Sequence, residues 1–116
     1  MINRILSAQN LQGKLPQELV KLPYLQEINL TRNYLSGTLP REWGTMNLTK
    51  IALVANGLSG KIPKELANIT SLKILSLKFN NCYGNLSVLG SLPHLEILHL
   101  TSLTISLENY LKHFQI

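Results

Sequence analysis

Residues 25–40 read LQEINLTRNYLSGTLP, and residues 48–63 repeat the same pattern as LTKIALVANGLSGKIP. Both stretches carry leucine or isoleucine at positions one, four and six, asparagine at nine, glycine at thirteen and proline at sixteen. The apolar triplet returns at steps of 23, 24 and 23 residues, as Leu25, Ile28, Leu30; Leu48, Ile51, Leu53; Leu72, Leu75, Leu77; and Leu95, Leu98, Leu100. A fixed period of this length indicates a repeat architecture in which each copy is one structural unit.

The apolar triplet predicts a short β-strand, because its second and third members point to the same side of an extended chain. One such strand cannot bury its apolar side alone, but stacked copies can pair into a parallel sheet over a shared leucine core. We therefore predict an α/β solenoid with one parallel strand per repeat on its concave face and turns with short 3-10 or α helices on its convex side. The predicted single array spans residues 1–116 in about five repeats, with strands near 4–8, 27–32, 50–55, 74–79 and 97–102.

An asparagine column follows the predicted strands at Asn33, Asn56 and Asn80. A side-chain amide both donates and accepts, so it can bond backbone groups of adjacent coils that would cost roughly 1–3 kcal/mol each if buried without partners. We predict a structural role for this column, and surface turns favoured by local geometry are the alternative. Downstream, prolines such as Pro40 predict the start of a short helical turn, and Trp43 is predicted to pack against the core.

Composition limits the chemistry that this chain can perform. No apolar run approaches the roughly 18–20 residues of a membrane span, and the first ten residues lack the apolar region of a secretory signal. The basic residues behind the net charge of +5 do not cluster, which argues against a nucleic-acid partner. The absence of aspartate excludes a Ser-His-Asp triad and a kinase centre. Cys82 and the histidines are not placed to converge on a metal, so we predict no catalytic, cofactor or metal residue.

The full motif, L-x-x-L-x-L-x-x-N-x-L-x-G-x-[IL]-P, resembles the plant-specific leucine-rich repeat over residues 4–100. Residues 7–23 and 25–44 resemble more narrowly the ectodomain of receptor-like kinases that combine such repeats with a malectin-like domain. The resemblance implies a non-catalytic fragment of the extracellular region of a membrane-anchored plant receptor, signalling through a cytoplasmic Ser/Thr kinase in a longer parent. It implies a protein or peptide ligand or a co-receptor as partner, and contact with the membrane only through segments of the parent.

Departures from the motif gather toward the end of the chain. Cys82 stands where the repeat has leucine, Ser87 where it has proline, and Leu103 where the next column asparagine belongs. We therefore predict that residues 103–116 are a degenerate or truncated repeat, and that the chain is a fragment. Two alternatives stay open: a secreted or cytosolic leucine-rich repeat inhibitor or adaptor, and a truncated gene product without activity.

The outward side chains of the concave strands are the candidate partner-binding residues, because a solenoid displays them on a rigid backbone. An ordinary solvated sheet face is the alternative. The candidates are Glu27, Asn29, Thr31, Arg32, Lys50, Ala52, Val54, Ala55, Ile74, Ser76, Lys78, Phe79 and His99.

Four N-x-[ST] sequons are candidate N-glycosylation sites, at Asn29, Asn47, Asn68 and Asn85. This is more than the composition would produce by chance, which favours passage through a secretory pathway. The alternative is that the repeat reuses its leucine and asparagine positions and creates sequons as a by-product. Asn29 is predicted to point to the concave face, where a glycan would obstruct binding.

Overall fold

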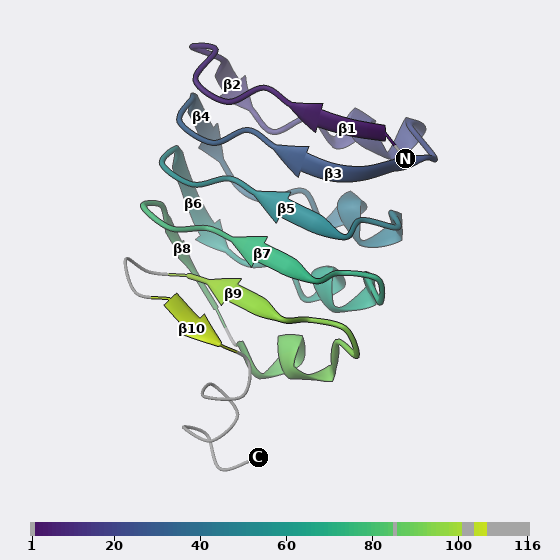
Figure 1. The fold of residues 1–116 in the computed structure, drawn as a ribbon. Helices are drawn as coiled ribbons and strands as arrows, with labels where there is room; N and C mark the ends of the chain where they lie inside the picture. Colours follow the sequence, from purple (N-terminus) through teal and green to yellow (C-terminus); the bar gives the residue numbers. More distant parts are fainter. Residues whose placement is uncertain (1, 85, 101–103, 107–116) are drawn as a thin grey trace.

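The computed structural model describes residues 2–84, 86–100 and 104–106, with side chains for residues 6–84 and 87–100 (Figure 1). Each of the first four coils contributes a strand to a larger sheet, which we call the concave sheet, then a strand to a smaller convex sheet, then a 3-10 helix. The concave sheet has the order β1 (Ile2–Ile5), β3 (Leu25–Asn29), β5 (Lys50–Ala52), β7 (Ile74–Ser76), β9 (Ile97–His99) and β10 (Thr104–Ser106).

Strand register in the concave sheet follows the sequence repeat. Ile28 pairs with Ile51, Ile51 with Leu75, and Leu75 with Leu98, all in parallel. These four side chains are fully buried and belong to one core with the other members of the apolar triplets. The predicted solenoid with a shared leucine interior is confirmed.

The convex side carries a second parallel sheet that the sequence analysis did not include. Its strands are β2 (Gln12–Lys14), β4 (Tyr34–Gly37), β6 (Gly57–Lys61) and β8 (Asn81–Tyr83). The two middle strands each bury one leucine between two exposed neighbours, as Leu35 in β4 lies between Tyr34 and Ser36, whereas β2 has no buried residue. A single buried residue is too short a pattern to indicate a strand from sequence.

Short 3-10 helices complete the convex side, as predicted. They are η1 (Gln17–Lys21), η2 (Arg41–Thr45), η3 (Lys64–Asn68) and η4 (Leu86–Ser91). Pro16, Pro40 and Pro63 have extended backbones and lie immediately before the first three helices. Each helix therefore begins one residue later than predicted from the sequence, which placed its start at the proline. The proline carbonyls accept the first helical hydrogen bonds, so proline sets each helix boundary without needing an N–H.

The concave strands end earlier than the sequence analysis expected. Arg32, Ala55 and Phe79 have φ angles of +59°, +60° and +58°, in the left-handed region, which turns the chain out of the sheet. These residues therefore lie at the rim of the concave sheet, although the sequence analysis assigned them to its strands.

The parallel order changes at the last described strand. β10 pairs antiparallel with β9, Thr104 lying opposite His99. Four residues separate these two positions, and a parallel connection needs a dozen or more, so this short link permits only antiparallel pairing. Of the predicted degenerate repeat at 103–116, only 104–106 is described, and the rest lies outside the described residues. In the described part of the chain, no helix has the length and apolar character needed to cross a bilayer.

Candidate recognition face

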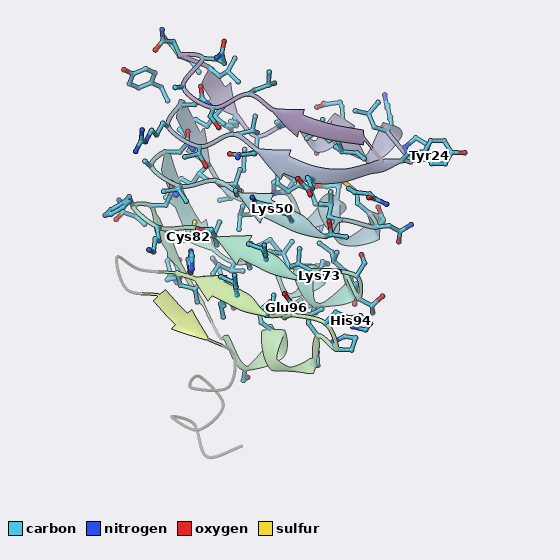
Figure 2. All side chains as sticks on the ribbon, in the orientation of Figure 1. Tyr24, Lys50, Lys73, Cys82, His94 and Glu96 are labelled. Carbon is cyan, nitrogen blue, oxygen red and sulfur yellow. The ribbon has the colours of Figure 1, made fainter. Side chains whose placement is uncertain are left out.

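The outward positions of the concave sheet form two columns in register. The first contains Glu27, Lys50, Ile74 and Ile97, and the second contains Asn29, Ala52, Ser76 and His99. Figure 2 shows Lys50 on β5, at the centre of this sheet. Thr31, Val54 and Lys78 continue the same outward alternation two residues beyond the second column.

The second column has nearly buried side chains at its centre, and we call this column the floor of the face. Ala52 and Ser76, whose side chains are small, are 6% and 5% exposed. Lys50 and Lys78 are partly exposed on the two sides of this floor. Alternation in the sequence does not distinguish these positions, whereas the structure separates the nearly buried Ala52 and Ser76 from the side chains that a partner can reach.

Polar contacts hold both ends of the floor. Asn29 Oδ1 accepts hydrogen bonds from Ser7 Oγ at 3.1 Å and from the Thr31 backbone N–H at 3.2 Å. At the other end, Ser76 Oγ lies 3.2 Å from His99 Nδ1. Partial burial and the positive charge of Lys78 lower the pKa of His99 below its usual value, which favours a neutral imidazole whose Nδ1 accepts from the Ser76 hydroxyl.

We expect the lowered pKa of His99 to make the array less stable in acid. The unfolded chain binds a proton at this ring more readily than the folded chain. The neutral ring's contribution to the free energy of unfolding is therefore fully present above the ordinary pKa of 6.5 and decreases as pH falls below it. Urea unfolding from neutral to mildly acidic pH should show this decrease, and His99→Gln should reduce it. An unchanged slope in the variant would contradict the assignment.

Phe79 is the most exposed apolar candidate at the rim, with 63% of its surface accessible. Its left-handed backbone disfavours a side chain with a β-carbon by about 1–2 kcal/mol and is better tolerated by asparagine. The same left-handed angle occurs at Arg32 and Ala55, so it belongs to the turn of each repeat. What distinguishes position 79 is its large exposed ring.

Replacing Phe79 by asparagine is expected to stabilise the fold by about 0.5–1 kcal/mol. Chemical denaturation measures this gain. Ala55→Asn is the matched control, because Ala55 has nearly the same φ angle but no exposed ring. A loss of stability in Phe79→Asn alone would show that the ring contributes to folding.

The asparagine column forms hydrogen bonds between coils. Asn33 Oδ1 accepts from the backbone N–H groups of Gln9 and Leu11, both at 3.0 Å, while its Nδ2 donates to the carbonyls of Leu6 at 2.9 Å and Leu30 at 2.8 Å. Asn56 and Asn80 repeat the arrangement one and two coils later. Each amide therefore joins its own coil to the preceding one.

Two of the sequon asparagines, Asn47 and Asn68, are exposed and occupy similar positions in successive repeats. Asn68 is the last residue of η3, and Asn47 follows η2 by two residues, so both stand where the chain returns from the convex side to the concave sheet. Asn29 is half-buried, with its Oδ1 already bonded. Asn85 lies outside the described residues.

A groove of about 1100 Å³ runs over the convex side, a feature that sequence reasoning missed. Three coils line it with their Pro16, Pro40 and Pro63 segments, and Glu18, Glu42 and Glu65 follow these prolines. The recurring [IL]-P-x-E run was the sequence feature from which this groove could have been predicted. The groove lies away from the concave candidates, between the convex sheet and the 3-10 helices.

The described residues include no candidate metal site. No group of three or more His, Cys, Asp or Glu side chains there could hold a metal. Cys82, which stands at a leucine position of the repeat, is half-buried on β8, and burial raises the pKa of its thiol. The one ion pair in this part of the chain joins Arg41 to Glu42 at 3.8 Å on the surface. The charges of Lys50, Lys78 and Glu27 are thus not neutralised by ion pairs with described residues.

The "Leucine Rich Repeat" family model matches residues 24–46. Together with the stacked parallel strands and the inter-coil asparagines, this match defines the chain as a leucine-rich repeat solenoid.

Its relatives are plant receptor-like kinases. A probable leucine-rich repeat receptor-like serine/threonine-protein kinase of Arabidopsis thaliana is 56% identical over 77 residues, which cover 66% of this chain but 8% of the relative. The LRR ectodomain of the receptor kinase SOBIR1 from Arabidopsis thaliana aligns with a TM-score of 0.77 and 30% identity, over 84% of this chain and 56% of that one. The plant peptide hormone receptor RGFR1, solved in complex with RGF2, aligns with a TM-score of 0.70 and 40% identity, over 73% of this chain and 14% of that one. The similarity to solved receptors thus lies in their repeat arrays.

Proposed function

We propose that this chain is a segment of the extracellular region of a plant leucine-rich repeat receptor-like kinase, and that its concave face binds a peptide or protein partner. The kinase activity and the membrane anchor would belong to other parts of the parent, as would a malectin-like domain. The similarity to SOBIR1 and to RGFR1, a receptor solved with a peptide hormone, supports this role.

The observation that carries the proposal is the combination of a rigid floor with partly exposed cations and an exposed aromatic ring. The floor at Ala52 and Ser76 is fixed by strand pairing on both sides, so little conformational entropy is lost when a partner settles on it. Lys50 and Lys78 flank the floor without ion pairs to described residues, and Phe79 offers an apolar contact at the rim. This chemistry fits an extended partner that carries carboxylates and an apolar side chain.

Charge reversal on the two faces tests the proposal. Peptides selected against the array from a displayed random library serve as probes. The double variant Lys50→Glu, Lys78→Glu is expected to weaken their binding by about tenfold or more, because like charges then meet across the interface. The matched control is Lys14→Glu, Lys61→Glu, which makes the same charge change beside the convex groove. Equal losses in both variants would show that the binding is nonspecific and overturn the concave assignment.

Glycosylation tests the proposed extracellular location. When the chain is passed through a plant secretory pathway, Asn47 and Asn68 are expected to carry glycans, because both are exposed and clear of the concave sheet. Electrophoretic mobility should increase after glycosidase treatment, and the change should be reduced in the double variant Asn47→Gln, Asn68→Gln. Mobility that does not respond to the enzyme would count against the extracellular proposal.

A further inference from the structure

Asn56 is the one asparagine in the sequence that is followed directly by glycine. This dipeptide favours deamidation, since a glycine places no side chain in the path of its own backbone nitrogen toward the neighbouring amide. The other column asparagines precede larger residues, Asn33 before Tyr34 and Asn80 before Asn81. The repeat thus supplies three asparagines in the same structural role, of which one has the reactive neighbour.

We propose that Asn56 is a site of spontaneous deamidation in this array, and that the fold controls the reaction by holding the amide between coils. In this reaction the deprotonated backbone nitrogen of Gly57 attacks Cγ of Asn56. A new N–C bond forms, the bond from Cγ to Nδ2 breaks, and the amide nitrogen leaves as ammonia. Water then opens the resulting five-membered imide at either carbonyl, giving aspartate or isoaspartate at position 56.

The folded array restrains the reacting group. Asn56 Nδ2 donates to the carbonyls of Leu30 at 3.0 Å and Leu53 at 3.1 Å, and its Oδ1 accepts from the Leu35 backbone N–H at 3.1 Å. Attack by Gly57 requires the amide carbon to rotate away from these partners on two coils. The reaction therefore needs local opening of the solenoid, and its rate reports how often that opening occurs.

The product restores only part of the bonding. An ionised carboxylate only accepts hydrogen bonds, so it can still accept from the Leu35 N–H but no longer donates to the carbonyls of Leu30 and Leu53. Those carbonyls keep the amides of Asn33 and Asn80 as donors, but they then face a negative charge. Isoaspartate also inserts an extra backbone carbon into the turn. Deamidation at this position consequently weakens the link between the coil of Asn56 and the preceding coil.

Trypsin separates the reactive site from its internal control. Cleavage after Lys50 and Lys61 yields residues 51–61 with Asn56 alone, and cleavage after Arg32 and Arg41 yields residues 33–41 with Asn33 alone. The chain is incubated in mildly alkaline buffer, with and without urea, before a brief digestion and mass spectrometry. In urea, the amide-to-acid mass gain should appear in 51–61 many times faster than in 33–41. Equal rates would overturn the site.

Comparing the deamidation rate of the native chain with that of the urea-unfolded chain tests whether the fold limits the reaction. Without urea, conversion at Asn56 is expected to be much slower, and equal rates with and without urea would overturn this part of the proposal. The matched variant is Gly57→Ala, compared in urea so that an effect on folding cannot change the rate. It should slow the conversion of Asn56 toward the rate at Asn33. In the folded protein Gly57 lies outside the left-handed region, and an added Cβ would lie 3.2 Å from the Leu35 carbonyl oxygen.

The consequence is measured with Asn56→Asp, which reproduces one product. Its melting temperature is expected to fall by about 10 °C, since the carbonyls of Leu30 and Leu53 then face a carboxylate in place of a donating amide. An unchanged melting temperature would show that the inter-coil bonds of Asn56 do not stabilise the array.

Discussion

Replacing Trp43 by alanine is expected to lower the free energy of unfolding by about 4 kcal/mol, as for other large-to-small changes in a packed core. Trp43 is the only tryptophan, lies on η2, and is fully buried. Its Nε1 also donates a hydrogen bond of 3.0 Å to the carbonyl of Pro16, immediately before η1. The substitution therefore opens a cavity and removes a link between two coils. Urea unfolding followed by circular dichroism measures the loss, since the variant has no tryptophan fluorescence.

Trp43→Phe separates the packing from the hydrogen bond. Phenylalanine keeps much of the buried ring but cannot donate to Pro16, so we expect a smaller loss of about 1–3 kcal/mol. Because a solenoid transmits stability between neighbouring coils, Trp43→Ala should also increase hydrogen exchange in β2 and β4. A loss below about 1 kcal/mol in Trp43→Ala would contradict the role of this side chain as the core anchor of η2.

Replacing Asn33 by leucine is expected to cost about 3 kcal/mol, although the two side chains are similar in size. The change leaves four backbone groups without this partner, the N–H groups of Gln9 and Leu11 and the carbonyls of Leu6 and Leu30. Some of these groups lie near the surface and can bind water, which keeps the expected loss well below the sum for four fully buried groups.

Asn81→Leu is the control for this prediction. Asn81 is exposed on β8, directly after the column residue Asn80, so its replacement should change stability by less than about 0.5 kcal/mol. Denaturant titration of both variants gives the comparison. Equal effects at positions 33 and 81 would mean that the column is not distinguished from ordinary surface asparagines.

Much of the architecture was predictable because the repeat restates each local preference several times. Ile28, Ile51, Leu75 and Leu98 recur at one position of the motif and are all fully buried. The capacity of an amide to donate and accept also made inter-coil bonds at Asn33 foreseeable, since few other residues serve both kinds of backbone group.

The candidate face was predictable only as a set of outward positions. Alternation along a strand indicates which residues point outward, but it does not indicate where the strand stops. The left-handed turns at Arg32, Ala55 and Phe79 shorten the strands and move these residues to the rim. The contact between Ser76 and His99 joins residues 23 positions apart, and the convex groove requires the segments of three coils.

By itself the sequence determined that this chain forms stacked coils with a common leucine interior, because a period of 23 or 24 residues puts the same apolar side chains at the same height in every coil. The tertiary structure alone decided which outward residues form the floor, which stand beside it and which lie at the rim. Those properties depend on the heights of neighbouring side chains and on backbone torsions set by the adjacent coil. The hydrophobic pattern of a single repeat specifies neither of them.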